Sequence, residues 1–342
     1  MTWRALCSAA LISVLGTAMS ADVTRTLLSF SDLKGWQADE HAAAFDTFLG
    51  TCGDISDIEW SQVCTIAKEN PNPRLFFETF FQPVLMENEE PPLFTGYFEP
   101  ELNGSLYRTG RFRYPIYGLP AEVTGNGKWL TRREIEQSQV LAGRGLELAW
   151  VDDPVAAFFL QIQGSGRVRL PNGKMIRLGY GGANGQPYRS IGKELVRMGE
   201  FDEHQVSASR ITEWVKANPT RGRELMWHNS SYVFFRRVDQ VPAEKGPLGA
   251  MNRSITKLRS IAVDPTIVKL GAPVWIEKGG PRPMNRLMVA QDTGSAINGA
   301  QRADIFFGTG RDAGIAAGLT KDPGRMVVLL PIRLAQDLVS GS

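Results

Sequence analysis

The sequence predicts a mainly β fold with a few helices, in which many short strands form a small barrel rather than a doubly wound sheet. Short apolar segments follow one another closely through the C-terminal third, and Gly-rich turns separate them. The chain has no internal repeat and no low-complexity linker. With 342 residues, 43% of them hydrophobic, it can bury a full core and is long enough for about two domains.

The first 21 residues have the features of a secretory signal peptide. Arg4 precedes an apolar run, and the small residues Ser20 and Ala21 follow it. We expect an exported, periplasmic protein that is soluble or peripherally associated with the outer membrane. Cys7 lies at the start of the apolar run rather than at its end, so no lipobox is expected. No later stretch approaches the ~20 apolar residues of a membrane-spanning helix.

Two cysteines remain in the mature chain, Cys52 and Cys64. An even count in an exported protein favours a disulfide over two separate buried thiols, and closing so short a loop would contribute ~3 kcal/mol. Neither a metal site nor a cofactor is expected, because no histidine has ligand spacing to another His or to Cys. The histidines are His41, His204 and His228.

The charges of the chain are nearly balanced, with 38 basic and 36 acidic residues and a net charge of +2. No basic block and no interleaved stripe of aromatic residues stands out. A nucleic acid is therefore not expected as a partner.

Helices are expected in two regions of the chain. Residues 36–50 and 73–86 are amphipathic and predict helices near the N-terminus. Two further helices are expected at 190–198 and 208–218. Strands are expected between turn signals, at 93–102, 156–163, 175–180, 260–264, 272–277, 286–292, 303–307 and 325–331.

The stretch Q-D-T-G-S-A-I-N-G-A-Q-R-A-D-I-F-F-G-T-G, at 291–310, carries three functional signals. D-T-G-S from Asp292 is half of an aspartic protease site, which needs two such loops, so a dimer would have to supply the second. G-T-G from Gly308 lacks the nucleotide-loop spacing and a surrounding βαβ unit. A turn at the start of a helix explains it better, and no nucleotide is expected.

The third signal is a set of aspartates at strand edges: Asp264, Asp292 and Asp304. Strands of a small barrel would bring these three carboxyls to one rim. Aspartates at strand ends also cap turns, so a structural role is the alternative for each.

Six longer segments carry a more specific pattern. Near the C-terminus they are I-A-V-D-P-T-I-V-K-L-G-A-P-V-W-I (261–276) and A-Q-D-T-G-S-A-I-N-G-A-Q-R-A-D-I-F-F-G (290–308). Upstream they are F-T-G-Y-F-E-P-E-L (94–102), D-P-V-A-A-F-F-L-Q-I-Q-G-S-G-R-V-R-L (153–170), G-Y-G-G-A-N-G-Q-P-Y-R-S-I-G-K-E-L (179–195) and G-P-L-G-A-M-N-R-S (246–254). Taken in their order along the chain, these segments resemble the membrane-bound lytic murein transglycosylase A family, and the resemblance extends over nearly the whole mature chain.

The resemblance implies a double-psi β-barrel domain assembled from residues 22–104 and 238–342. It implies a second β-rich domain, 105–237, inserted between these segments, with a glycan groove in the cleft. Many members of the family are outer-membrane lipoproteins, and this sequence departs from them in the expected absence of a lipobox.

The resemblance also implies an activity: cleavage of the bond between N-acetylmuramic acid and N-acetylglucosamine in peptidoglycan, leaving a 1,6-anhydromuramyl end. The position of the catalytic acid falls on Asp304, with Asp292 as its carboxylate neighbour. The expected partners are peptidoglycan glycan strands and other cell-wall enzymes, and the chain is expected to be a monomer.

Residues of the resembling segments also supply candidate sugar contacts. They offer amide, hydroxyl and carboxyl groups and ring faces, although each could instead pack or form a turn. These candidates are Tyr97, Gln161, Gln163, Ser165, Asn184, Tyr188 and Asp264.

One carboxylic acid suffices for this reaction, because the C6 hydroxyl of the sugar is a tethered nucleophile. Asp304 must then have a pKa well above its reference of ~3.9, raised by Ile305, Phe306 and repulsion from Asp292. An inverting glycoside hydrolase on a β-1,4-glycan would instead need a second carboxylate ~6.5–9.5 Å away to activate water. A peptidoglycan-binding module without turnover is the other alternative.

Overall fold

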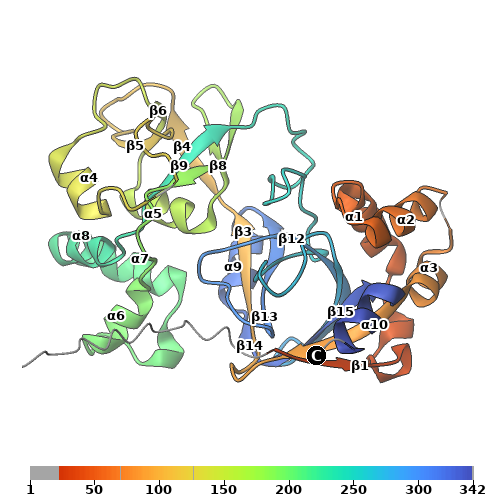
Figure 1. Ribbon diagram of the computed structural model, residues 1–342. Coiled ribbons are helices and arrows are strands. Elements are labelled where there is room, and N and C mark those ends of the chain that lie inside the picture. Colours follow the sequence, from red (N-terminus) through yellow and green to blue (C-terminus); the bar gives the residue numbers. More distant parts are fainter. Residues whose placement is uncertain (1–22, 70, 126, 341–342) are drawn as a thin grey trace, which may run out of the picture.

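The computed structural model describes residues 23–69, 71–125 and 127–340, and the expected signal peptide lies outside them. These residues form two parts, each built around one β-sheet (Figure 1). The strands of the first part are β1 (Thr24–Leu27), β2 (Phe81–Glu87), β3 (Leu93–Glu99), β10 (Ser260–Val263), β11 (Pro273–Lys278), β12 (Met284–Asp292), β13 (Arg302–Thr309), β14 (Lys321–Asp322) and β15 (Gly324–Pro331). The strands of the second part are β4 (Glu101–Ser105), β5 (Tyr114–Tyr117), β6 (Glu147–Val151), β7 (Gly166–Arg169), β8 (Met175–Ala183) and β9 (Val233–Arg237).

The first sheet has nine strands in the order β1-β2-β15-β11-β12-β10-β13-β3-β14. Strand β3 pairs in parallel with β13, and β10 pairs in parallel with β12, whereas the other neighbours are antiparallel. Strands from both ends of the chain therefore lie side by side in one sheet, so neither end can complete it alone.

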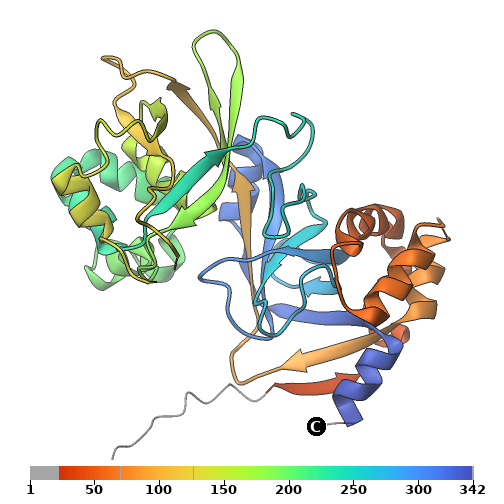
Figure 2. The same ribbon diagram turned by 45° about the horizontal axis from the view of Figure 1, so that its top comes forward.

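The second sheet has six strands in the order β5-β6-β4-β7-β8-β9. Strand β4 belongs to it, so residues 101–104, which the sequence grouped with the first part, pair in the second sheet. The chain crosses between the parts at Pro100, where β3 runs directly into β4, and returns after β9 (Figure 2).

Ten α-helices lie within the described residues, more than the few that the sequence predicted. Five belong to the first part: α1 (His41–Cys52), α2 (Ile58–Ala67), α3 (Pro73–Phe80), α9 (Arg311–Gly318) and α10 (Ile332–Ser340). Five belong to the second: α4 (Arg132–Ser138), α5 (Pro154–Gln163), α6 (Ile191–Arg197), α7 (Ala208–Ala217) and α8 (Pro219–His228). The fold is therefore mixed and sheet-rich rather than mainly β. Short 3-10 turns occur at η1 (Phe30–Asp32), η2 (Trp36–Ala38) and η3 (Glu203–Gln205).

The strand predicted at 156–163 is wrong, because these residues belong to helix α5. The side chain of Asp153 accepts hydrogen bonds from the amides of Val155 and Ala156, and Pro154 occupies the first helical position. The helix is apolar on nearly all sides because it packs between two hydrophobic clusters of the second part. An apolar run without polar alternation does not distinguish a buried helix from a buried strand.

The N-terminal helices also differ from the prediction. The helix predicted at 73–86 ends at Phe80, and residues from Phe81 onward form β2. Pro83 has no amide hydrogen and would break a helix there. The helix predicted at 36–50 begins at His41, after a short 3-10 turn, and runs to Cys52. The helices predicted at 190–198 and 208–218 are confirmed as α6 and α7, but Pro219 also opens α8.

Helices α1 to α3 pack on the first sheet through one aromatic cluster. Phe48 contacts Trp60, Phe76, Phe77 and Phe81, with ring centroids 5.8–6.5 Å apart. These rings are fully buried, so the cluster contributes much of the hydrophobic stabilisation of this part. A disulfide joins Cys52 to Cys64, with the Cα atoms 5.6 Å apart, and so connects the end of α1 to α2.

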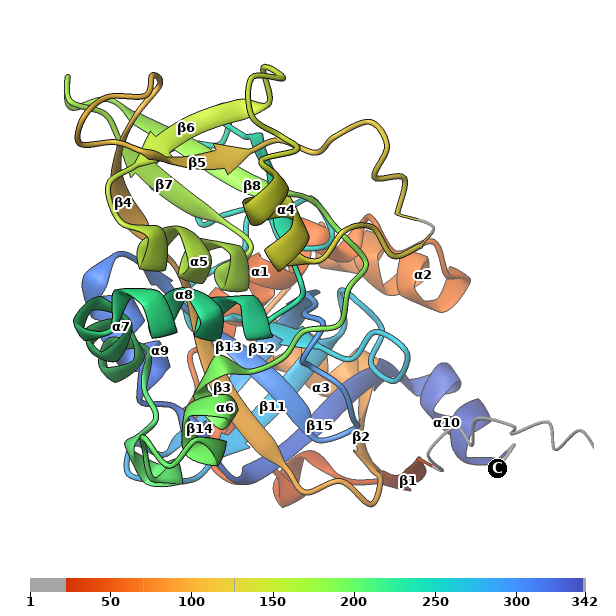
Figure 3. The same cartoon turned by 90° about the vertical axis from the view of Figure 1, so that its left-hand side faces the viewer.

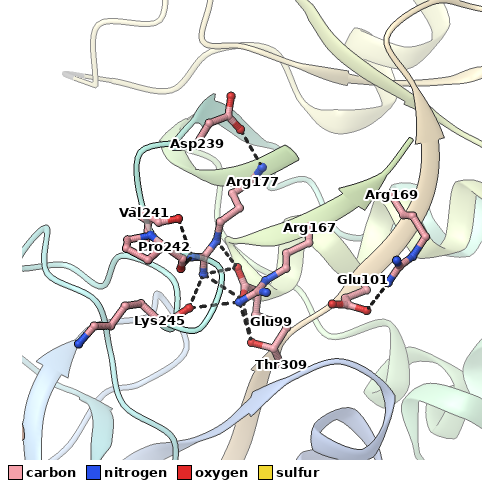
Figure 4. A network of polar contacts seen from close by, with 10 residues as sticks. All are labelled: Glu99, Glu101, Arg167, Arg169, Arg177, Asp239, Val241, Pro242, Lys245 and Thr309. Carbon is pink, nitrogen blue, oxygen red and sulfur yellow. Dashed lines mark hydrogen bonds and ion pairs between the residues drawn. The ribbon is translucent and has the colours of Figure 1, made fainter. Parts of the chain in front are cut away.

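A buried carboxylate joins the two parts (Figure 4). Glu99, fully buried at the end of β3, accepts hydrogen bonds from Arg167 Nε at 2.8 Å and from Arg177 Nη2 at 3.0 Å. The hydroxyl of Thr309 donates to the same carboxylate, and both guanidinium groups donate to the carbonyl oxygen of Lys245. Glu99 therefore connects β3, β7, β8 and β13, and its two arginines add the returning segment.

A second contact joins the parts at β14, the edge strand that pairs with β3. Figure 3 shows α6 in front of β14. Lys321 of β14 forms an ion pair with Glu203 of η3 at 3.0 Å. Both side chains are exposed, so this pair contributes little to stability beside the buried Glu99 cluster.

Candidate active site

The sheet register brings two of the three predicted aspartates together. Strand β10 lies between β12 and β13, and its Ala262 pairs with both Asp292 and Asp304. Directly paired residues point to the same face of a sheet. The two carboxyl groups therefore lie on one face, on either side of a small, buried alanine.

Asp304 is half-buried and has one free carboxylate oxygen. The Thr95 hydroxyl donates to Asp304 Oδ1 at 2.7 Å, because β3 and β13 place these two residues opposite each other. Arg302 Nη2 in turn donates to Thr95 Oγ1 at 2.9 Å. Burial raises the pKa of Asp304 to about 6, against the opposing effects of Thr95 and Arg302. No donor to Asp304 Oδ2 is found among the described residues.

Asp292 is also half-buried, but both of its oxygens are occupied. Its Oδ1 accepts from the amides of Ala250 at 3.0 Å and Thr293 at 2.9 Å, and its Oδ2 accepts from the Tyr97 hydroxyl at 2.9 Å. Burial raises the pKa of Asp292 to about 6, these three donors oppose the rise, and the charge of Asp304 adds to it.

The hydrogen bonds distinguish the two carboxyl groups. Donors stabilise the ionised form of a carboxyl group. Asp292 accepts three such bonds and Asp304 accepts one, so hydrogen bonding favours the ionised form more strongly at Asp292. The charge of Asp304 opposes this by raising the pKa of Asp292, whereas burial, and not the predicted repulsion from Asp292, raises the pKa of Asp304. Two neighbouring carboxyls with pKa values raised to about 6 can supply one proton donor near that pH.

Tyr97, a predicted sugar contact, serves the carboxylate pair instead. Its ring packs on Phe306 with centroids 5.3 Å apart, and its side chain is buried. Burial and the nearby aspartates raise the pKa of Tyr97 well above its ordinary value, so it stays a neutral donor to Asp292.

Three further predicted contacts are occupied by bonds within the protein. Gln161 accepts from buried Arg132 at 2.5 Å, and Gln163 accepts from the Phe98 amide at 3.0 Å. Asn184 is fully buried and bonds four backbone groups through its amide side chain. Gln161 and Asn184 therefore hold the second part together, and Gln163 connects α5 to β3 of the first part.

Asp264 does not join the carboxylate pair. Its Oδ1 accepts from the amide and hydroxyl of Thr266, and its Oδ2 accepts from the Gly299 amide at 2.9 Å. These bonds lower the pKa of Asp264, against the opposing effect of burial, so it is a charged turn residue. Asp264 follows β10 at the strand end where the pair lies, but its carboxylate bonds Thr266 and Gly299 rather than Asp292 or Asp304.

The last two predicted sugar contacts differ in exposure, since Ser165 is buried and Tyr188 is exposed. No hydrogen bond of the Ser165 hydroxyl is found within the described ranges. Tyr188 exposes 37% of its surface, so its ring face is open to solvent.

Sequence reasoning missed three residues that bond the carboxylate pair, Thr95, Ala250 and Thr293, and it missed Arg302, which bonds Thr95. Thr95 could have been found, because it lies two residues before Tyr97 on the same strand, and alternate residues share a face. Ala250 acts through its backbone, which a side-chain pattern does not reveal.

A separate cavity lies away from this pair. It has a volume of about 620 Å³, and Lys34, Glu277 and Arg325 are among its lining residues. The carboxylate of Glu277 already accepts from Arg325 and from Trp275. It therefore offers no free acid. Within the described ranges, no cluster of three or more His, Cys, Asp or Glu could hold a metal ion.

A sheet-rich fold with two neighbouring carboxyls of raised pKa defines a candidate general-acid enzyme. Family models match the chain at two places: the MltA specific insert domain at residues 93–236 and the 3D domain at residues 259–330. The chain belongs to the membrane-bound lytic murein transglycosylase A family.

Relatives from three organisms support this membership. The membrane-bound lytic murein transglycosylase A of Vibrio cholerae is 34% identical over 68% of this chain, and the aligned region spans 64% of that relative. The crystal structure of a membrane-bound lytic murein transglycosylase from Agrobacterium tumefaciens has a TM-score of 0.80 and is 30% identical, covering 92% of this chain and 99% of that one. Escherichia coli MltA with bound chitohexaose has a TM-score of 0.71 and is 29% identical, covering 86% and 90%.

The relatives are named membrane-bound. In the part of this chain that the structure describes, no helix is both long and apolar enough to span a bilayer.

Proposed function

We propose that this protein is a peptidoglycan lytic transglycosylase in which Asp304 is the single general acid and base. The observation that carries the proposal is the carboxylate pair. Asp304 has a pKa raised to about 6 and one free oxygen, and the oxygens of its neighbour Asp292 are occupied by donors that favour the ionised form.

The geometry supports a two-stage proton transfer. Neutral Asp304 donates its proton to the glycosidic oxygen as the bond from C1 of N-acetylmuramic acid breaks. The C6 hydroxyl of the same sugar then bonds to C1, and the Asp304 carboxylate accepts the hydroxyl proton. The products are a 1,6-anhydromuramyl end and a free N-acetylglucosamine hydroxyl, and no water is consumed. Asp292, held as an anion, favours the positive charge that develops at C1.

An inverting hydrolase is a poorer fit to the same site. It would need a second carboxylate with a free oxygen to activate water. Both oxygens of Asp292 accept hydrogen bonds, so Asp292 is not free to act as that base.

We assign the nine-stranded sheet to a double-psi β-barrel domain formed by residues 22–104 and 238–342. Residues 105–237 form the inserted domain, with β4 as the strand that crosses the boundary. A glycan groove between the domains would present Ser165 and Tyr188 to the sugars. The bound chitohexaose of the Escherichia coli relative supports a glycan strand as the ligand.

We place the enzyme in the periplasm, where peptidoglycan lies, either free or attached to the inner face of the outer membrane. The membrane-bound relatives support the second possibility.

The test is a digestion of purified peptidoglycan sacculi followed by mass spectrometry of the soluble products. We expect 1,6-anhydromuropeptides from the native protein and a loss of ~10²–10⁴-fold in their release by Asp304→Asn. Products with reducing ends would show hydrolysis instead. Binding to sacculi without release of soluble fragments would show a binding module.

A further inference from the structure

The segment G-P-L-G-A-M-N-R-S-I at 246–255 forms a tight loop between the two parts. The Ile255 amide donates to the Pro247 carbonyl, and the amides of Gly249 and Asn252 close two further turns inside the loop. Asn252 has φ 55°, in the left-handed region that asparagine tolerates better than most residues. The loop therefore has a defined shape of its own.

This loop lies directly against the carboxylate pair. The amide of Ala250 donates to Asp292 Oδ1 at 3.0 Å. A Cβ atom on Gly249 would lie 2.6 Å from the carbonyl oxygen of Gln291, the residue before Asp292. Only glycine allows the loop this close to the end of β12.

Two side chains hold the loop from opposite sides. From β9 of the second part, Arg236 Nη2 donates to Asn252 Oδ1 at 2.8 Å, while its Nε donates to the Tyr180 carbonyl at 3.2 Å. From the first part, Asp54 accepts two bonds of 2.8 Å from Arg253. Asp54 lies two residues after the disulfide-bonded Cys52, so this attachment point is itself restrained.

We propose that Arg236 and the Arg253–Asp54 pair are positioning residues for the reaction, because they hold the Ala250 amide on Asp292 and so keep Asp292 anionic and the shared proton on Asp304. The inference rests on the proposed function. It gives the second part an effect on the catalytic pair through a single backbone hydrogen bond.

The other groups around Asp292 belong to elements outside this loop. Tyr97 approaches from β3, Asp304 lies across Ala262 on β13, and Arg302 acts through Thr95. The Thr293 amide belongs to the residue that follows Asp292 in the chain. The Ala250 amide is therefore the one donor to Asp292 that the loop itself supplies.

The test compares Arg236→Ala and Arg253→Ala with two matched controls, in the mature protein. Arg237→Ala removes the next arginine of β9, which pairs with Asp239 and not with the loop. Lys269→Ala breaks another exposed pair of the first part, with Asp57. The pKa of Asp292 is measured by NMR of 13C-labelled aspartate carboxyls, with the spectrum of Asp292→Asn as the assignment.

We expect the pKa of Asp292 to rise by about half to one unit in Arg236→Ala and Arg253→Ala, because a donor to its ionised form is lost. The acid limb of the pH profile of anhydromuropeptide release should move to higher pH by a similar amount, with both controls at the native position. An unchanged Asp292 titration in the two loop variants overturns the proposal. The NMR measurement needs no turnover, so it decides the point even if the proposed activity fails.

Discussion

Replacing Thr95 with valine tests the hydrogen bond that orients the proposed catalytic acid. Valine keeps the shape of threonine but has no hydroxyl. The change removes the 2.7 Å bond to Asp304 Oδ1 and the acceptor of Arg302 Nη2 at 2.9 Å. Thr95→Ser is the matched control because it keeps the hydroxyl.

The direction of the pKa change follows from the bond. The Thr95 hydroxyl stabilises ionised Asp304, and its loss therefore raises the pKa of Asp304 above its native value of about 6. A hydrogen bond to a charged group contributes about 1.5–3 kcal/mol, and one pKa unit corresponds to ~1.4 kcal/mol, so we expect a rise of about one unit. The acid form then persists to higher pH.

The assay is the pH dependence of anhydromuropeptide release from sacculi. In Thr95→Val the alkaline limb should move up by about one pH unit. The maximal rate should fall by about tenfold, because the acid loses its orientation and becomes weaker. Thr95→Ser should keep the native profile. A lower rate with an unmoved alkaline limb would mean that Thr95 only supports the fold, and the assigned role would be wrong.

Three further predictions concern the stability of the protein and its disulfide. The pKa of Asp304 is higher in the folded than in the unfolded chain, so native stability falls as pH rises from about 4 to 6. Urea unfolding should therefore show Asp304→Asn to be more stable than the native protein by about 1–3 kcal/mol at about pH 8. Near about pH 3 the two proteins should be equally stable. Glu99→Gln should lose about 3–5 kcal/mol because it leaves two buried guanidinium groups without their anion, whereas Glu101→Gln, which breaks an exposed pair, should lose less than 1 kcal/mol; equal losses would contradict the role of the buried cluster. Finally, the denatured, unreduced mature protein should titrate no free thiol, since Cys52 and Cys64 are paired, and any thiol signal would refute the pairing.

The strands of the C-terminal third were predictable because they lie in a buried sheet. Residues 260–264, 272–277, 286–292, 303–307 and 325–331 correspond to strands β10 to β13 and β15, since short apolar runs between Gly-rich turns are typical of such strands. Helix α5 was not predictable in this way. It packs on two hydrophobic clusters, so its sequence has no polar face and shows no helical periodicity. The other helices of the second part also form within its tertiary packing.

The sequence could predict those residues of the candidate site whose side chains lie on or at the edge of a predicted strand. Asp292 and Asp304 lie at strand edges, and pairing with one residue of β10 brings them together. The sequence gives equal weight to Asp264, which differs only in its local donors: the amides of Thr266 and Gly299 occupy it. Strand position therefore identifies candidates, and hydrogen bonding in the folded state selects among them.

The same criterion separates ligand contacts from structural residues in the resembling segments. A buried polar side chain must find partners inside the protein, because leaving it without them costs about 1–3 kcal/mol. Asn184 satisfies this requirement with four backbone groups and has no capacity left for a sugar. Its place in a family-like segment reflects the loop geometry that it holds. Asp304, in contrast, is half-buried, and its Oδ2 atom has no donor among the described residues. A group that stays incompletely bonded in the free protein is the one that a substrate can complete, and for that reason we place the chemistry at Asp304.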